Sequence, residues 1–462
     1  MIGLLYLLFT MILIISIIFR KRTPFVDPRF MIDMGLLVYY AIPGIVYTCF
    51  EEYGSRSKYA IFINFNVFSN EILYYAYLCI IIFYVSFIIG SQIKLGKRKK
   101  DNEIDCVVQF KNERRFTKRL SLSISIICLV LFLLYCSLFG GLTTVMLNIA
   151  NIREGLIQTE TGTYDFINKL YNCAPFAVYL LIDRCRKEKR YSILVYSLIV
   201  SLLILISNGG RGILLTFFLT LIIGDYIRKT DVDHLRYNYV KVLQIFGIVI
   251  FMLVMYRPLL VALGSFQGGG FTQVYSDYID YLMSSSRYDA SSLDGIFSSI
   301  FQSTTHYFLS LHVSIFKVAT DEYTPRYFLE PICILMNIIP SKLLDISKPL
   351  TLTYYNSFFI AGVPGLIQIP SGVVGEAFYS GGVFFVCLYG FMIGMIGRKI
   401  LNIYHSMKKR VVFIPTFYVG VLFVYFHFAI GGDYASQFVK DFTSLLIIFL
   451  VVNRTARTMK RC

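Results

Sequence analysis

Arg211 stands in a glycine-rich turn between two apolar segments, in the sequence Asn208-Gly209-Gly210-Arg211-Gly212. Glycines let the backbone turn tightly and approach a ligand closely. An arginine near membrane depth is costly unless it has a partner or a function. If it starts a helix, its charge adds to N–H groups that favour anions. Two interpretations stay open: an anion-binding arginine, or one that extends from the turn to the membrane surface.

Two further arginines could act together with Arg211. Arg257 precedes Pro258 at the end of an apolar run, and Arg287 lies two residues before Asp289. Guanidinium groups bind phosphate oxygens through two hydrogen bonds and keep their charge. The three arginines could therefore hold a diphosphate. The alternatives are a lipid-headgroup anchor for Arg257 and a local ion pair with Asp289 for Arg287.

Two residues are candidates for a general base. His306 lies in the long segment 264–372, which mixes polar and apolar stretches. An imidazole titrates near neutral pH and is a common proton acceptor. Glu376 lies in Gly375-Glu376-Ala377, where the chain enters an apolar run, and a carboxylate at that depth needs a partner or a task. Structural roles stay open for both: a core position for His306, and a pairing with an arginine for Glu376.

Several kinds of chemistry have no matching motif in this sequence. It contains no Walker A motif, no Rossmann glycine fingerprint, no HExxH and no GxSxG. The ten cysteines form no CxxC pair and no Cys/His metal spacing. We therefore predict no metal site and no cofactor.

Long apolar runs must position these residues. The chain has 462 residues, of which 56% are hydrophobic and 16% charged, and its mean hydropathy is +0.65. Soluble proteins carry about 45–50% apolar and about 25% charged residues. Most runs approach the ~17–25 residues that a helix needs to cross a membrane. We predict an all-α polytopic integral membrane protein with about eleven transmembrane helices: 3–19, 34–50, 72–93, 120–138, 166–182, 191–207, 213–227, 242–263, 373–396, 411–430 and 442–452.

The basic residues predict the orientation of these helices. Lysine and arginine are enriched in cytoplasmic connections. Alternate connections, beginning with 20–33 and 94–119, hold 32 of the 44 basic residues. The N-terminus is therefore predicted outside and the C-terminus inside. Orientation also explains the net charge of +16, so a nucleic-acid partner is not expected.

This orientation defines three segments of the chain. Residues 1–263 form a transmembrane bundle, and residues 373–462 form a second one. Between them, residues 264–372 form a large extracytoplasmic loop with apolar stretches at 296–316 and 327–339. These stretches are too short or too interrupted to span, so we expect interfacial helices. The chain has 35 tyrosines and no tryptophan. Tyrosine is common at membrane interfaces, and its ring can also stack on sugars.

Cysteine labelling tests this topology. Cys106 in the 94–119 connection should react with an impermeant maleimide only after the membrane is opened. A Thr324→Cys variant should react in intact cells, because residues 264–372 are predicted to lie outside. Both are measured in a background without the other cysteines, with that cysteine-free protein as the control. Labelling of position 324 from the cytoplasmic side alone would contradict the orientation.

Three short motifs resemble one family. They are Ile338-Ile339-Pro340-Ser341-Lys342, Lys348-Pro349, and the stretch from Pro370 to Gly382 that contains Gly375-Glu376. They resemble the Wzy-type O-antigen and capsular polysaccharide polymerases, which carry a proline-rich segment with Lys-Pro late in a large outer loop. A Gly-Glu, aromatic and glycine stretch then leads into the next span. The Gly-Gly-Arg-Gly turn at 209–212 is also similar.

The resemblance implies a glycosyltransferase in the bacterial cytoplasmic membrane, with its active site facing the periplasm or cell exterior. It would polymerise oligosaccharide repeat units carried on undecaprenyl diphosphate. Arg211, Arg257 and Arg287 would bind the diphosphate, and Glu376 or His306 would accept the proton. Its partners would be these lipid-linked glycans and membrane lipid, with a chain-length regulator and a flippase as further candidates.

Two other functions stay open from the sequence. An O-antigen ligase would use the same donor with a different acceptor. A lipid-linked oligosaccharide flippase should place charges along a path through the bundle, often with internal repeats, and no repeat is visible here.

Overall fold

The computed structural model describes residues 2–19, 27–49, 68–93, 113–149, 152, 163–208, 210–230, 247, 304–327, 329–338, 349–362, 369–408 and 411–460. Within these ranges every regular element is a helix. The elements are α1 (Ile2–Ile18), α2 (Pro28–Leu36), η2 (Leu37–Ala41), α3 (Ile42–Cys49), α5 (Asn70–Gln92), α6 (Glu113–Leu138), α7 (Leu142–Leu147), α9 (Thr163–Tyr171), α10 (Pro175–Glu188), α11 (Ser192–Ser207), α12 (Arg211–Thr230), α17 (His306–Ala319), α18 (Leu329–Ile338), α20 (Leu352–Ala361), α21 (Gly372–Met407), α22 (Ile414–Gly431) and α23 (Tyr434–Lys460).

Six of the described helical segments are long and apolar enough to cross a membrane: Pro28–Cys49, Asn70–Gln92, Arg114–Leu138, Gly372–Met407, Ile414–Gly431 and Tyr434–Thr455. The helices Ile2–Ile18 and Ser192–Ser207 are apolar but shorter. These helices indicate a polytopic integral membrane protein, as predicted. The predicted span 242–263 lies outside the described residues.

One predicted span is wrong in detail. Residues 166–182 do not form a continuous helix, because α9 ends at Tyr171 and α10 begins at Pro175. Proline lacks an N–H and clashes inside a helix, but it fits the first helical position. Pro175 therefore begins a new helix where hydropathy alone shows one apolar run.

The helix α21 is longer than the predicted span 373–396 and is broken near its start. Gly381 and Gly382 depart from helical geometry, and Gly382 has φ +63° and ψ −151°. This conformation is essentially open only to glycine. The break separates the short piece that carries Glu376 from the long remainder of α21.

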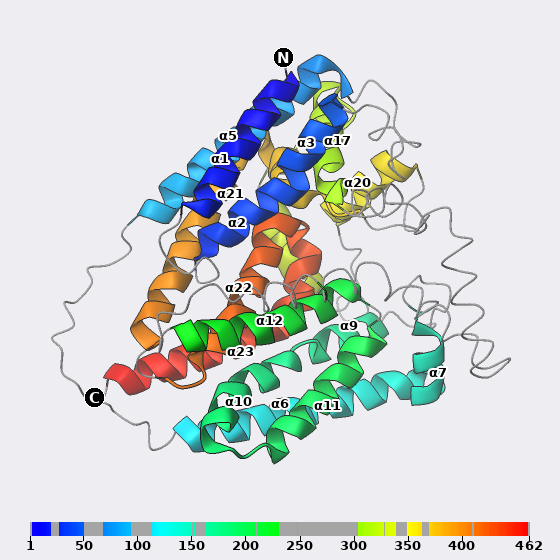
Figure 1. The fold of residues 1–462 in the computed structure, drawn as a ribbon. Helices are drawn as coiled ribbons and strands as arrows, with labels where there is room; N and C mark the ends of the chain where they lie inside the picture. The colour runs from blue at the N-terminus through cyan, green and yellow to red at the C-terminus, as the bar shows by residue number, and fades with distance from the viewer. Residues whose placement is uncertain are drawn as a thin grey trace. The chain divides into compact units, whose positions relative to one another are not determined.

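The chain divides into two compact units. Unit 1 contains Met1–Ile104, Phe297–Ile403 and Val424–Val439, and unit 2 contains Asp105–Ile296, Tyr404–Phe423 and Lys440–Cys462. In unit 1, α1 packs against α2 and α3, while α17 packs against α5 and α20 (Figure 1). The aromatic side chains of Tyr6, Phe83 and Phe308 are fully buried in the core of this unit.

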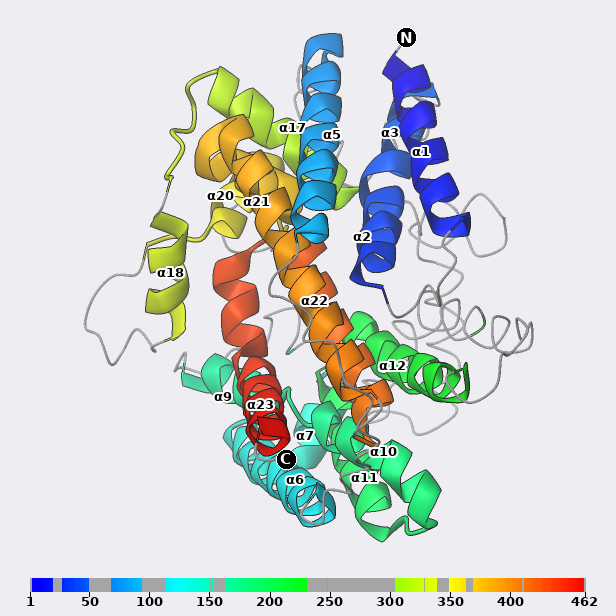
Figure 2. The ribbon, with the colours of Figure 1, turned by 90° about the vertical axis from the view of Figure 1, so that its left-hand side faces the viewer.

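Glycines allow α5 and α21 to touch through their backbones within unit 1, where the two helices run side by side (Figure 2). A β-carbon on Gly390 would overlap the carbonyl oxygen of Phe83, and one on Gly394 would overlap that of Phe87. Small residues permit such close approach between membrane helices, where packing is the main source of association.

Replacing Gly390 with alanine should therefore destabilise the protein. The neighbour is backbone, so the helices must separate, and overpacking of this kind costs ~1–3 kcal/mol. Thermal unfolding of the detergent-purified protein measures the effect. Gly212→Ala is the matched control, because an added β-carbon there has no atom within 4 Å. Equal melting temperatures for the two variants would contradict the contact.

Unit 2 is built around α6, which packs against α9, α10 and α11 (Figure 1). Polar contacts join its helices at one end. Arg184 donates to Thr117 Oγ1 at 2.7 Å, and the backbone N–H of Thr416 donates to Asp183 at 3.0 Å. Arg186 of α10 pairs with Asp225 of α12 at 2.6 Å.

Candidate functional site

Glu376 joins two helices of unit 1 through its carboxylate. Its side chain lies on the first part of α21 and is fully buried. One oxygen accepts from the N–H of Asp433 and from Ser371 Oγ at 3.4 Å, and the other accepts from the N–H of Tyr434 at 3.1 Å. The first N–H groups of a helix have no partner within that helix. Glu376 therefore caps the N-terminus of α23, where a negative charge is also favoured.

Two glycines make this contact possible. Gly372 and Gly432 both have positive φ, +68° and +62°. A β-carbon on Gly432 would lie 2.6 Å from the backbone of Gly372, and one on Gly372 would lie 2.6 Å from the Tyr40 hydroxyl. The start of α21 and the turn before α23 thus meet backbone to backbone.

A structural role for Glu376 was expected from the sequence to be a pairing with an arginine. The structure shows other partners. Among the described residues no arginine pairs with this carboxylate, and its partners are the backbone N–H groups and a serine hydroxyl. Its burial and these bonds give it a clear role in holding α21 to α23. The role of Glu376 as a general base stays a prediction.

His306 lies close to the same region of unit 1. It begins α17, and its ring contacts the rings of Tyr39 and Tyr307, with centroids 6.0 and 4.1 Å away. A β-carbon on Gly372 would lie 2.8 Å from Tyr307 Cβ, so the helix start that carries His306 approaches the start of α21. His306 is partly exposed, as a proton acceptor for a substrate must be.

The second histidine of α17 has a structural role. His312 is fully buried, and its Nδ1 lies 2.7 Å from the carbonyl oxygen of Phe308. Burial lowers the pKa of His312 to about 4, although the Phe308 carbonyl acts in the opposite direction. The ring is therefore neutral at physiological pH and packs against the rings of Phe308 and Phe68 in the core of unit 1.

Of the three arginines predicted to bind a diphosphate, only Arg211 lies among the described residues. Arg211 begins α12 in unit 2, as expected for an arginine at a helix start. Arg257 and Arg287 lie outside the described residues. The convergence of these arginines with Glu376 and His306 stays a prediction.

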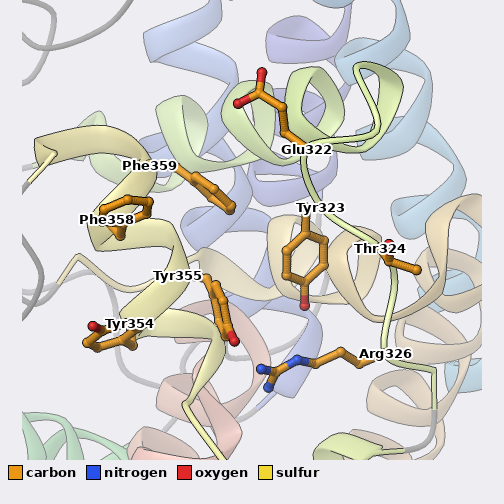
Figure 3. Close-up of a pocket in the computed structure, with 8 residues that line it drawn as sticks. All are labelled: Glu322, Tyr323, Thr324, Arg326, Tyr354, Tyr355, Phe358 and Phe359. Carbon is orange, nitrogen blue, oxygen red and sulfur yellow. The ribbon is translucent and has the colours of Figure 1, made fainter.

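A pocket of about 520 Å³ lies between α20 and the segment that follows α17 (Figure 3). Ligand pockets for small molecules typically measure ≈ 300–1,000 Å³ and combine aromatic walls with a few polar groups. Its lining residues are aromatic or polar: Glu322, Tyr323, Thr324, Arg326, Tyr354, Tyr355, Phe358 and Phe359.

Arg326 is fixed at one side of this pocket. Its guanidinium carbon lies 4.5 Å from the centre of the Tyr355 ring, and its Nη1 donates to the Leu350 carbonyl at 2.6 Å. The same nitrogen lies 3.5 Å from Glu330 Oε1. Burial raises the pKa of Glu330, while the charge of Arg326 favours its ionised form.

The aromatic wall of the pocket is built around Tyr323. Its ring centroid lies 5.7 Å from that of Tyr355 and 4.9 Å from that of Tyr379 behind it. At the rim, Lys317 pairs with Glu322 and lies over the Phe359 ring at 5.2 Å.

Helix α21 connects the pocket to the Glu376 cap. Tyr379 follows Glu376 by three residues, so the two side chains lie on one side of α21. The Tyr379 hydroxyl donates to Asn356 Oδ1 of α20 at 3.3 Å, and Asn356 Nδ2 donates to Ser310 Oγ of α17 at 2.9 Å. These bonds fix α17, α20 and α21 against one another.

This pocket and its helix α20 are not among the features predicted from the sequence. Arg326 was a visible signal, because it is a basic residue in a segment predicted to lie outside the cytoplasm. The doublets Tyr354-Tyr355 and Phe358-Phe359 were a second one, since residues four apart share a helix face.

Comparison with protein-family models, curated proteins and solved structures finds no significant match.

Proposed function

We propose that this protein is a membrane glycosyltransferase that polymerises oligosaccharide repeat units carried on undecaprenyl diphosphate. It acts at the outer face of a bacterial cytoplasmic membrane and elongates O-antigen or capsular polysaccharide. The observation that carries the proposal is the aromatic pocket with Arg326, which is attached through Tyr379 to the helix of the Gly-Glu motif.

The composition of the pocket suits a glycan. Flat aromatic side chains offer apolar faces to sugar rings, and the charged and hydroxyl groups at its edge can meet sugar hydroxyls. The pocket lies within residues 264–372, the segment predicted to face the cell exterior. The apolar helices support a membrane enzyme whose donor and acceptor are both lipid-linked.

The proposed reaction requires no cofactor. The acceptor sugar hydroxyl attacks the anomeric carbon of the donor, a carbon–oxygen bond forms, and the bond from that carbon to the lipid diphosphate breaks. The diphosphate leaves with the electron pair, and arginines such as Arg211 would stabilise its charge. The hydroxyl proton passes to a base, for which Glu376 and His306 are the candidates.

Gene deletion followed by gel analysis of surface polysaccharide tests the function. A polymerase mutant should lose the ladder of long chains and retain single repeat units, and the wild-type gene should restore the ladder. A normal ladder would contradict the proposal. Loss of single units as well as chains would favour a flippase, and full-length polymer left on its lipid carrier would favour a ligase.

A further inference from the structure

The charges around the pocket are already paired. Arg326 lies beside Glu330, whose side chain is 2% exposed, and Lys317 pairs with Glu322 at the rim. A diphosphate carries several negative charges and needs cations whose charge is not already matched. The pocket therefore offers little net charge to the lipid-linked end of a substrate.

The apolar surface of the pocket is open to a ligand. Phe358 is 45% exposed, although a ring of this size is usually buried. Tyr354 precedes it by one helical turn and lines the same pocket, so the two rings lie on one side of α20 (Figure 3). Aromatic faces of this kind match the apolar face of a sugar ring rather than a phosphate.

One buried hydroxyl group beside the pocket lacks a hydrogen-bond partner among the described residues. Tyr323 is 7% exposed, and its hydroxyl oxygen has no hydrogen-bond partner in the part of the chain that is described. Figure 3 shows this hydroxyl pointing toward Arg326 at the floor of the pocket. Leaving a buried polar group unsatisfied is costly, so native structures normally provide a partner. The oxygen has almost no exposed surface of its own, so a ligand hydroxyl supplies this partner once the Arg326 side chain shifts to admit it.

We infer that this pocket is a subsite for an uncharged sugar residue of the glycan, and that the Tyr323 hydroxyl is its polar contact. The inference rests on the proposed function for the identity of the glycan. It separates recognition of the sugar, by the pocket, from recognition of the diphosphate, by arginines elsewhere in the chain.

Tryptophan fluorescence measures binding at this pocket directly. The chain has no tryptophan, so Phe358→Trp places a single reporter at the rim. The probes are the repeat-unit oligosaccharide released from its lipid carrier and inorganic diphosphate. Phe384→Trp on α21, a position that is 68% exposed and outside the pocket lining, is the matched reporter.

The oligosaccharide should change the fluorescence of the Phe358→Trp protein in a saturable way and leave the Phe384→Trp protein unchanged. Inorganic diphosphate should have no effect on either. A saturable response to diphosphate, or no response to the oligosaccharide at concentrations that sustain polymerisation, would overturn the inference.

Tyr323→Phe tests the role of the hydroxyl, because it removes a single oxygen. In the Phe358→Trp background it should raise the dissociation constant for the oligosaccharide about tenfold, which corresponds to the loss of one good hydrogen bond. The melting temperature should stay the same or rise, since an unsatisfied buried group is removed. A structural role predicts unchanged affinity instead, and that result would overturn the assignment. Tyr75→Phe on α5, outside the pocket lining, is the control.

The binding assay and the polymerisation assay can fail separately. If the deletion strain shows a normal ladder but the pocket binds oligosaccharide, the proposed function fails and the sugar site stands. If the protein polymerises repeat units but Phe358→Trp reports no binding, the function stands and the subsite is wrong.

Discussion

Replacing Glu376 with glutamine is expected to destabilise the protein by about 2 kcal/mol, the range of hydrogen bonds to a charged group. The carboxylate accepts from the N–H groups of Asp433 and Tyr434, so both of its oxygens are used. Glutamine has one oxygen and one NH₂ group. One backbone donor would then face another donor inside a fully buried site, and the favourable charge at the start of α23 would be lost. Thermal unfolding of the purified protein and its level in the membrane measure this change.

The control for this variant is Glu71→Gln, at an exposed position in the first turn of α5. It should leave the melting temperature nearly unchanged. If Glu376→Gln instead keeps its melting temperature while specific activity falls by ~10²-fold or more, Glu376 is the general base. His306→Ala provides the comparison, because loss of a partly exposed base should lower activity and leave stability intact.

Replacing Arg211 with alanine should reduce polymerisation by about 10²–10³-fold, the effect of removing one group that stabilises developing charge. In the proposed reaction the lipid diphosphate gains negative charge as it leaves. Arg211 begins α12 directly after Gly210, where helix N–H groups add to the attraction for an anion. The rate of chain growth on lipid-linked repeat units in vesicles is the measurement.

Two further variants make the Arg211 result specific. Arg211→Lys should rescue poorly, since a single point charge cannot replace the planar fork of the guanidinium. Arg190→Ala, at an exposed site in a connection predicted to be cytoplasmic, should retain full activity. Wild-type chain length in Arg211→Ala at normal protein level would remove this residue from diphosphate binding.

Most helices could be predicted because apolar length is a local property of the sequence. The predicted 72–93, 191–207 and 411–430 agree with α5, α11 and α22 within a few residues. These helices are apolar on all sides, so hydropathy alone marks them. The break between α9 and α10 could not be predicted from hydropathy because it is short, Asn172-Cys173-Ala174, with apolar residues on either side, and Pro175 marks the new start.

The partners of Glu376 could not be predicted because they are distant in the sequence. Asp433 and Tyr434 follow it by 57 and 58 residues, and no local pattern links a carboxylate to a remote backbone N–H. Gly372 and Gly432 form a second contact between residues that are distant in the sequence. Each looks like an ordinary turn glycine, and only the fold shows that they touch. The pocket was missed for a similar reason, since α20 is short and its aromatic residues also suit a membrane interface.

The break in α21 bears on the depth at which Glu376 lies. From residue 383 to Ile396, before Arg398 and Lys399, the second part of α21 is about 21 Å long at 1.5 Å per residue, which is less than the ~30 Å thickness of the hydrocarbon layer. The piece from Gly372 to Gly381 adds about 15 Å and is needed to complete the predicted crossing. In the predicted orientation, Glu376 therefore lies in the outer part of a membrane-spanning helix. Its complete burial means that protein atoms, and not lipid, surround the carboxylate there.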